Sequence, residues 1–279
     1  MNNLSKVSET AILTLRSRVV ESRKNHPVIS DPVGVELLRR IEKQAPEGSI
    51  KSLLHRKLPG TLTNPLALRA RKYDSFAINF IKSQPDGIIV NLGAGFDTRY
   101  WRMNNERIKY FEVDLPEVIE AKKTLIGDLI NYEMLSTSVL EDDWIEHIAS
   151  LQTSNILLMA EGLFMYLPEN EVIRTFTKIS ETFSNSKIIF EVVNKKYTQG
   201  FRKRMVEQKM KRRMGCSAGS SYNYGVQNAR EIENYGNGIK VVEEWSYFDD
   251  KDIKPSFLRL FCNVRFMSRT QWTIVADLD

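Results

Sequence analysis

The sequence predicts an α/β fold, with a mostly parallel β-sheet, helices on both faces and a helical cap. Short apolar runs alternate with segments of helical periodicity, as expected for buried parallel strands joined by helices. A glycine or polar residue follows each of the first four runs, at Gly93, Asp114, Ser138 and Glu161, at spacings of 21, 24 and 23 residues. We therefore expect these four positions at one edge of the sheet, where ligands bind in open α/β folds.

The elements follow in order along the chain. Apolar side chains at Ile12, Leu15 and Val19 predict a first helix, and Asp31-Pro32 begins a second. Residues 45–65 contain proline and glycine, which predicts a loop with one short helical piece, and a longer helix starts at Leu66. The predicted strands are 87–92, 108–114, 132–137, 156–160 and 187–193, followed by two closing strands at 239–248 and 271–277.

Charge and composition exclude several classes of protein. The chain has 279 residues and a net charge of +5, but residues 195–213 alone carry nine basic residues and one acid. Positive charge confined to one helix does not predict a nucleic-acid enzyme, which more often spreads it over a face. Two cysteines and three isolated histidines offer no disulfide framework and no metal site. No apolar run approaches the ~20 residues of a membrane helix, so we expect a cytoplasmic protein without a membrane partner.

The glycine-rich turn Asn91-Leu-Gly-Ala-Gly-Phe-Asp-Thr-Arg99 predicts a nucleotide-like ligand, because glycine lets the backbone approach a ligand closely. The third glycine of a dinucleotide-binding turn is missing, and Asp97 and Thr98 stand near that place. A carboxylate there caps the following helix and repels a phosphate. A P-loop is excluded because no Gly-Lys-Ser/Thr follows. The remaining ligand contains adenosine and no phosphate, which is S-adenosylmethionine.

Two carboxylates suit parts of that ligand. Asp114 ends a strand 21 residues after Gly93, where an acid accepts hydrogen bonds from ribose hydroxyls, although it could instead cap the helix at Pro116. Glu161 ends another strand and is placed for the ammonium group, its alternative being a pair with a surface lysine. Ser138 begins a turn that can reach the adenine edge, or else caps the next helix.

Five motifs in order resemble the leucine carboxyl methyltransferase-like family, which includes bacterial O-methyltransferases assigned to polyketide biosynthesis. They are LRARKYD (68–74), NLGAGFDTR (91–99), YFEVDLPEVIEAK (110–122), SVLEDDW (138–144) and AEGLFMYL (160–167). The resemblance covers about residues 8–195 and implies a Rossmann-like class I methyltransferase with a seven-stranded sheet. Many members have Asp-Leu where this chain has Ser138-Val139.

The resemblance also implies roles for individual residues. Arg69 or Arg71 would hold the cofactor carboxylate, Asp114 the ribose, Ser138 and Val139 the adenine, and Glu161 the amino group. The implied cofactor-binding positions are Arg69, Arg71, Gly93, Ala94, Gly95, Asp114, Leu115, Ser138, Val139, Glu161 and Gly162.

We expect a single domain with four parts: a helical cap (1–65), a cofactor-binding core (66–194), a basic lid insertion (195–238) and closing strands (239–279). The predicted function is methyl transfer to a carboxylate or hydroxyl of a small-molecule acceptor. Tyr166 is a candidate for orienting the acceptor, or else a half-buried aromatic residue. The basic helix 195–213 could attract an anionic acceptor, but its composition favours a solvated lid helix. The alternatives are a protein C-terminal carboxyl methyltransferase, an NAD-dependent oxidoreductase and a non-enzymatic protein whose basic helix binds RNA or an acidic partner.

Overall fold

The structure is a computed structural model that describes residues 9–45, 49–105, 108–153, 155–214 and 221–279. Within these ranges seven strands form one sheet in the order β3-β2-β1-β4-β5-β7-β6, and β7 alone runs antiparallel to its neighbours. This arrangement confirms the predicted mostly parallel, seven-stranded sheet. The strands are β1 (Ile88–Leu92), β2 (Lys109–Asp114), β3 (Glu133–Ser136), β4 (Ile156–Ala160), β5 (Ser186–Val193), β6 (Ile239–Trp245) and β7 (Gln271–Leu278).

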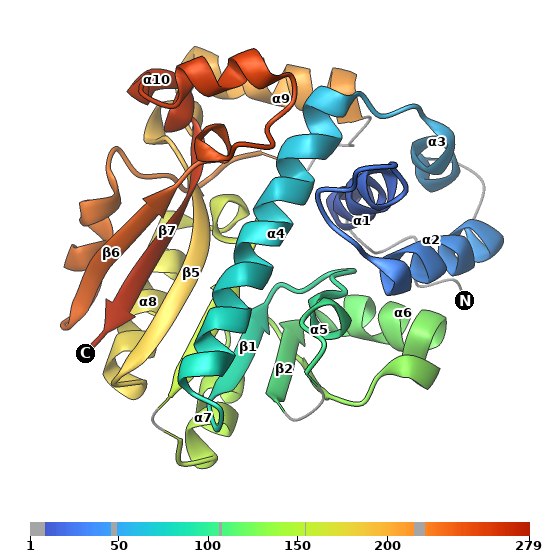
Figure 1. Cartoon of the computed structure of the whole chain (residues 1–279). Coiled ribbons are helices and arrows are strands. Elements are labelled where there is room, and N and C mark those ends of the chain that lie inside the picture. The colour runs from blue at the N-terminus through green and yellow to red at the C-terminus, as the bar shows by residue number, and fades with distance from the viewer. Residues whose placement is uncertain (1–8, 46–48, 106–107, 154, 215–220) are drawn as a thin grey trace.

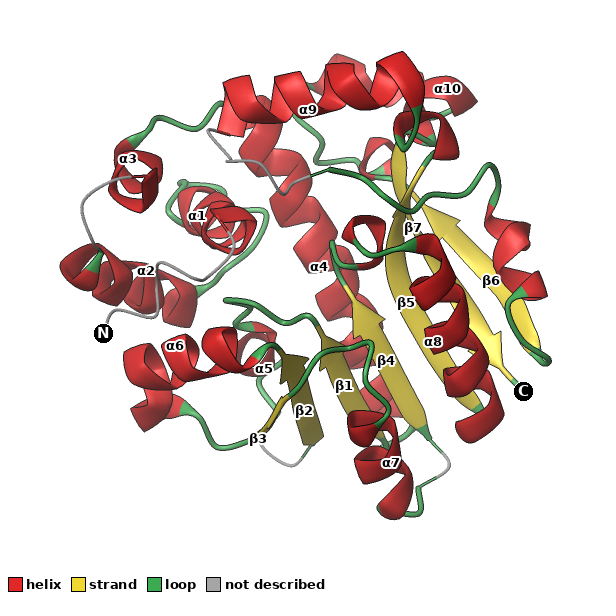
Figure 2. Ribbon diagram, turned by 180° about the vertical axis from the view of Figure 1, so that it is seen from behind, coloured by secondary structure: helices red, strands yellow, loops and turns green. Residues whose placement is uncertain are grey.

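Helices cover both faces of the sheet. On one face Phe176 of α8 belongs to the same buried cluster as Val90 and Leu158 of the central strands (Figure 2). On the other face Phe80 of α4 packs in a cluster with Ile89 (Figure 1). The helices are α1 (Glu9–Ser22), α2 (Pro32–Gln44), α3 (Ser49–His55), α4 (Gly60–Ser83), α5 (Arg99–Arg102), α6 (Pro116–Ile126), α7 (Asp143–Ser150), α8 (Glu169–Thr182), α9 (Gly200–Met214) and α10 (Arg265–Ser268).

Helices α1 to α3 form a group of their own beyond the carboxyl ends of β1 and β2 (Figure 1). Their apolar side chains share a buried cluster with α6 and with Phe96 of the glycine turn. Asp31 begins α2 as expected, since its side chain accepts from the nitrogen of Gly34 at 2.9 Å. Residues 1–8 and 46–48 of the predicted cap lie outside the described residues. The cap is thus packed directly against the turn that follows β1.

The start of α4 was wrong in the sequence prediction. The helix begins at Gly60, six residues before Leu66, and contains Pro65. Tertiary contacts hold its first turns: the side chain of Asn64 bonds to the oxygen of Asp252 and the nitrogen of Lys254, and Thr63 donates to Glu21. These partners are distant in sequence and outweigh the helix-breaking tendency of proline.

The predicted lid consists of short elements around α9. A 3₁₀ turn (Lys195–Tyr197) precedes α9, and another (Ala229–Asn234) leads into β6. Residues 215–220, which include Cys216, lie outside the described residues. In Figures 1 and 2, α9 and α10 lie at the end of the molecule where the parallel strands point. Within the described ranges, no helix has the length and apolar character required to cross a membrane.

Candidate active site

The turn after β1 adopts a conformation that requires glycine at two positions. Gly93 has φ +62° and Gly95 has φ +54°, both in the left-handed region. A Cβ atom on Gly93 would lie 2.7 Å from Cδ1 of Leu163, so even alanine would push that side chain aside. Between them Ala94 is buried. The main chain of this turn is therefore held close to the loop after β4.

Asp114 connects the end of β2 to this turn. One carboxylate oxygen accepts from the nitrogen of Gly95 at 2.6 Å, and the other from the nitrogen of Leu115 at 2.7 Å. Helix α6 has Leu115 as its N-cap and no side-chain cap, so Asp114 is not the capping residue of the plainer interpretation. The side chain of Leu115 is 45% exposed at this edge and offers an apolar surface.

Beside the glycine turn lies a group of buried charges that we call the carboxylate–arginine cluster. It joins residues of α4, the turn after β1, α5, the loop after β4, and β5. The members are Arg69, Asp74, Asp97, Arg99, Arg102, Glu161 and Glu191. Three guanidinium groups face four carboxylates, so the fully ionised cluster carries one negative charge.

Glu161 lies between two of these arginines. Its Oε1 atom is 2.8 Å from Nε of Arg69, and its Oε2 atom is 2.5 Å from Nη2 of Arg99. Arg69 reaches further to Glu191, whose Oε2 atom is 2.6 Å from Nη1. Gly162, at φ +67°, lies against this pair, because a Cβ there would be 3.6 Å from both Nη2 of Arg69 and Glu191. The loop after β4 thus passes close over Arg69.

Arg99 and Arg102 connect the rest of the cluster. Nε of Arg99 bonds to Asp74 at 2.9 Å, and Arg102 holds both oxygens of Asp74. Asp97 accepts from the nitrogens of Thr98 and Arg99 just before α5, but Thr98 is the N-cap residue of that helix, so the predicted capping role of Asp97 was wrong. Its charge is also paired with the side chains of Arg99 and Arg102. The turn, α4 and α5 are therefore fixed to one another by charge.

The protonation of the carboxylates follows from burial and from the arginines. Burial acts to raise the pKa of Asp97 and of Glu161, but the neighbouring guanidinium groups outweigh it and hold both pKa values below the ordinary range. Burial raises the pKa of Glu191, and Arg69 offsets only part of that effect. The positive charges thus keep Asp97 and Glu161 ionised.

The two candidate arginines of α4 have different surroundings. Arg69 is buried in the cluster, whereas Arg71 is partly exposed and pairs with Asp250 and Asp252, both at 2.8 Å. Positions two apart on a helix point in roughly opposite directions, about 200° around the axis. Of the two, Arg69 is the one that contacts Glu161.

The turn after β3 contains the residues expected near adenine. Oγ of Ser138 accepts from the nitrogen of Leu140 at 3.2 Å, and the oxygen of Val139 accepts from the Trp144 indole at 3.1 Å. The side chain of Val139 is buried. Ser138 therefore shapes its own turn, and both residues lie in the loop that leads to α7.

Aromatic rings gather beyond the loop after β4. The rings of Tyr166 and Tyr222 lie with their centroids 5.8 Å apart, and Asn223 donates to the main-chain oxygen of Tyr166. Burial raises the pKa of Tyr222, and it raises the pKa of Tyr247 to about 12. Both phenols also feel the charges of Glu191 and Arg69. These neutral phenols can orient an acceptor but are poor proton acceptors at neutral pH.

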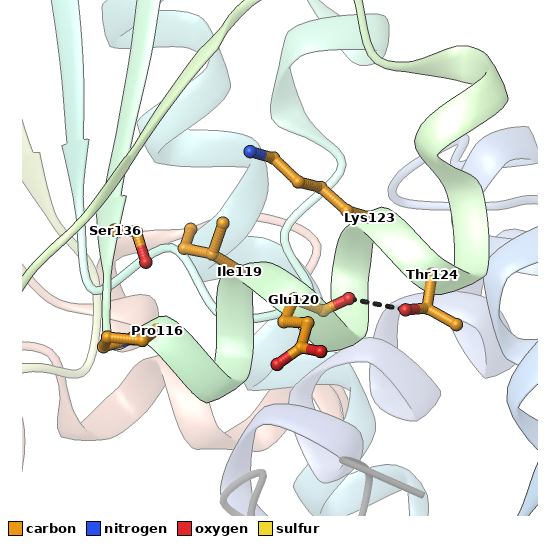
Figure 3. Close-up of a pocket in the computed structure, with 6 residues that line it drawn as sticks. All are labelled: Pro116, Ile119, Glu120, Lys123, Thr124 and Ser136. Atoms are coloured by element: carbon orange, nitrogen blue, oxygen red, sulfur yellow. Dashed lines mark hydrogen bonds between the residues drawn. The ribbon is translucent and has the colours of Figure 1, made fainter. Parts of the chain in front are cut away.

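A separate surface depression of about 520 Å³ lies along α6 and the end of β3 (Figure 3). It is lined by Pro116, Ile119, Glu120, Lys123, Thr124 and Ser136. Among these lining residues, Oγ1 of Thr124 donates a hydrogen bond to the main-chain oxygen of Glu120. None of the predicted site residues lines it, although Pro116 follows Leu115 and Ser136 is the strand partner of Asp114.

Sequence reasoning assigned no role to several residues of the cluster. Asp74 and Arg99 stand inside the matched motifs LRARKYD and NLGAGFDTR, and Glu191 stands in a predicted strand. Glu191 could have been noticed, because it is a charged residue in an otherwise apolar strand. A buried charge is costly without a partner, so its presence there predicts a paired cation. Arg18 was also missed: it pairs with Asp31 and donates to the oxygen of Phe96, which ties α1 to the glycine turn.

Comparison with known proteins identifies the family of the chain. The sequence model described as leucine carboxyl methyltransferase matches residues 11–180. The chain is 29% identical over 256 residues to the tetracenomycin polyketide synthesis O-methyltransferase TcmP of Streptomyces glaucescens, covering 88% of this chain and 85% of TcmP. It is 23% identical to the S-adenosyl-L-methionine-dependent methyltransferase dpfgK of Gibberella zeae, covering 88% and 84%. A solved methyltransferase domain of bacterial CtHen1 is 14% identical, with a TM-score of 0.47, covering 75% and 98%.

Proposed function

Because the chain belongs to the leucine carboxyl methyltransferase family, we propose that it methylates an oxygen atom of a small-molecule acceptor. Membership makes it an S-adenosylmethionine-dependent methyltransferase, which sets aside the oxidoreductase alternative and the non-enzymatic one. Transfer to oxygen is supported by TcmP, whose name describes an O-methyltransferase of polyketide synthesis. The acceptor is then a carboxylate or a hydroxyl group.

The observation that carries the proposal is the charge of the carboxylate–arginine cluster. With all members ionised, four carboxylates against three guanidinium groups leave one negative charge beside the glycine turn. A buried site with this excess favours a cation and disfavours a diphosphate. The residues present therefore fit the positively charged methyl donor, and Asp97 is one of the four carboxylates that give the excess.

The cofactor-binding roles follow from position. Arg69 would bind the carboxylate group, because Nη2 carries no bond to a carboxylate of the described chain while Nε and Nη1 are engaged. Glu161 would accept from the ammonium group and Asp114 from the ribose. Leu115 and the turn at Ser138 and Val139 would contact the adenine. Gly93, Ala94, Gly95 and Gly162 would leave room for the methionine part.

When bound, the cofactor supplies a methyl group on a sulfonium, and the reaction is an in-line displacement. The task of the protein is to align the acceptor oxygen and to exclude water. Tyr166 and Tyr222 lie beyond the loop after β4 and would orient the acceptor through their phenols. A carboxylate acceptor is ionised at neutral pH and needs no base. The nine basic residues of 195–213 favour an acceptor that is itself an anion.

Calorimetry on protein stripped of bound ligand tests the cofactor. We expect heat with S-adenosylmethionine and with S-adenosylhomocysteine, and none with NADH. Glu161→Gln should bind both more weakly, while Glu146→Gln, on the exposed surface of α7, serves as the control. Absence of heat with both sulfur compounds would remove the proposal.

A screen with labelled methyl donor tests the acceptor. Carboxylic acids, phenols and a peptide ending in leucine are offered separately, the last because the family description names leucine carboxyl groups. A methyl ester loses its label in alkali and an aryl ether keeps it, so the stability of the product separates the two kinds of oxygen. Uptake by amines alone would contradict transfer to oxygen.

A further inference from the structure

Two segments at one end of the molecule, the start of α9 and residues 254–264, expose large apolar side chains. Phe201 of α9 is 75% exposed, and Leu260, in the 3₁₀ turn Ser256–Phe261, is 78% exposed. In Figures 1 and 2, α9 and α10, which follows that turn, lie at this same end. The exposed apolar residues of the two segments are Phe201, Met205, Phe257, Leu260 and Val264.

Basic side chains stand among these apolar ones. Arg202 and Arg204 flank Phe201 and Met205, and Lys254 and Arg259 flank Phe257. All four basic side chains are exposed, and none is paired with a carboxylate of the described chain. We call these nine residues the basic–apolar surface.

The acids near the basic–apolar surface are already engaged. Asp250 and Asp252 hold Arg71, and Glu207 accepts from Oγ of Ser221. Arg71 neutralises Asp250 and Asp252, and Glu207 is one acid against the nine basic residues of 195–213, so the surface keeps an excess of positive charge. Such a surface attracts anions from solution.

We propose that the basic–apolar surface docks on an anionic lipid bilayer. Protruding phenylalanine and leucine side chains enter the boundary between headgroups and acyl chains, and arginine and lysine contact anionic headgroups. A peripheral contact of this kind needs no spanning helix, so it is compatible with the lack of such a helix in the described ranges. The inference does not require the proposed function, although Arg202 and Arg204 are also among the basic residues that favour an anionic acceptor.

Two other occupants fit less well. A protein interface has an apolar centre with few lysines and a polar rim, whereas here charged and apolar side chains alternate along both segments. A second copy of this chain would bring two surfaces of the same charge together. A bilayer accepts both features, because apolar and basic groups occupy different depths within it.

Vesicle co-sedimentation tests the proposal with the full chain. Vesicles of phosphatidylcholine alone are compared with vesicles in which part of it is replaced by phosphatidylglycerol. We expect binding to the anionic vesicles that weakens as salt is added, because added ions screen the attraction. Binding to the neutral vesicles should be weaker than binding to the anionic vesicles by at least about tenfold.

Paired variants separate the two contributions. Arg202→Glu with Arg204→Glu should lower the partition coefficient by at least about tenfold. Phe257→Ser with Leu260→Ser should lower it by about tenfold as well, even at low salt. The matched controls are Lys82→Glu with Lys109→Glu for charge and Leu151→Ser for apolar exposure, all exposed on other parts of the molecule. Affinity for S-adenosylhomocysteine checks that each variant is folded.

Three results would overturn the proposal. One is that the unmodified protein fails to bind anionic vesicles at low salt. Another is that the control variants lower binding as much as the surface variants do. The last is a dimer in sedimentation velocity that Phe257→Ser with Leu260→Ser dissolves, without vesicle binding, which would assign the surface to a second copy of the chain.

Discussion

The main-chain nitrogen of Gly95 lies 2.6 Å from Oδ2 of Asp114, which ties the turn after β1 to the end of β2. The two residues are 19 positions apart, and their bond spans two neighbouring parallel strands. Because the carboxylate holds the turn through one oxygen and Leu115 through the other, a bound ligand meets an acid whose orientation is already set. This relationship leads to the first prediction.

Asp114→Asn should weaken the binding of S-adenosylhomocysteine by about tenfold, because a charged acceptor makes stronger hydrogen bonds to hydroxyls than an amide does. The amide oxygen can still accept from Gly95, while the amide NH2 group cannot accept from Leu115, so thermal unfolding is measured alongside to check the fold. Titration calorimetry measures the affinity, with Asp86→Asn, in an exposed turn, as control. Equal affinity in Asp114→Asn and the unmodified protein would count against a ribose contact.

Substitution of Arg69 and Arg71 by lysine should have different results. Arg69→Lys cannot span Glu161 and Glu191 at once, so buried carboxylate is left without a partner, and we expect a loss of stability of about 3–5 kcal/mol. Arg71→Lys affects a partly exposed pair and should cost about 1 kcal/mol or less. Urea unfolding measures the loss of stability in both variants, and cofactor affinity measured in parallel shows which arginine binds the cofactor carboxylate. A larger loss of affinity in Arg71→Lys would move the carboxylate site to Arg71.

Gly93→Ala should destabilise the protein by about 1–3 kcal/mol, because it puts a side chain at φ +62° and against Leu163. Gly127→Ala is the matched control. Gly127 ends α6 at φ −57°, and no atom lies within 4 Å of a Cβ there. That variant should be neutral or stabilised by up to about 1 kcal/mol. Thermal unfolding with and without S-adenosylhomocysteine measures both effects, and an unchanged Gly93→Ala would contradict the requirement for glycine.

Glu112 makes stability depend on pH. Burial raises its pKa from 4.5 to about 7, although the ammonium of Lys122 lies 2.7 and 2.8 Å from its two oxygens and opposes the shift. The folded state then binds more protons than the unfolded state between pH 4.5 and about 7, so the contribution of Glu112 to stability falls as pH rises through that interval. Glu112→Gln should remove this part of the pH dependence. Unfolding free energies of both proteins across the interval test it, and parallel curves would contradict it.

Strand and helix order was predictable because buried parallel strands leave a local signature of apolar runs. Val90 and Leu158 are buried where the runs predicted. The start of α4 was not predictable, because Asn64 is held by Asp252 and Lys254, which are 188 and 190 positions away in the sequence. The pairing of Arg99 with Glu161 joins residues 62 positions apart, so the cluster could be seen only after folding. The choice between Arg69 and Arg71 depended on the rotation of α4, which its polar and apolar residues do not fix alone.

The place of β7 has a consequence for synthesis of the chain. β7 pairs with β5 on one side and with β6 on the other, so β6, which is made first, has no neighbour in the sheet until residues 271–278 exist. During synthesis, the edge of β5 that will pair with β7 stays open while residues 194–270 are translated. An open strand edge invites pairing with other nascent chains. Pairing of β7 with β5 therefore covers the open edge and removes this opportunity for aggregation.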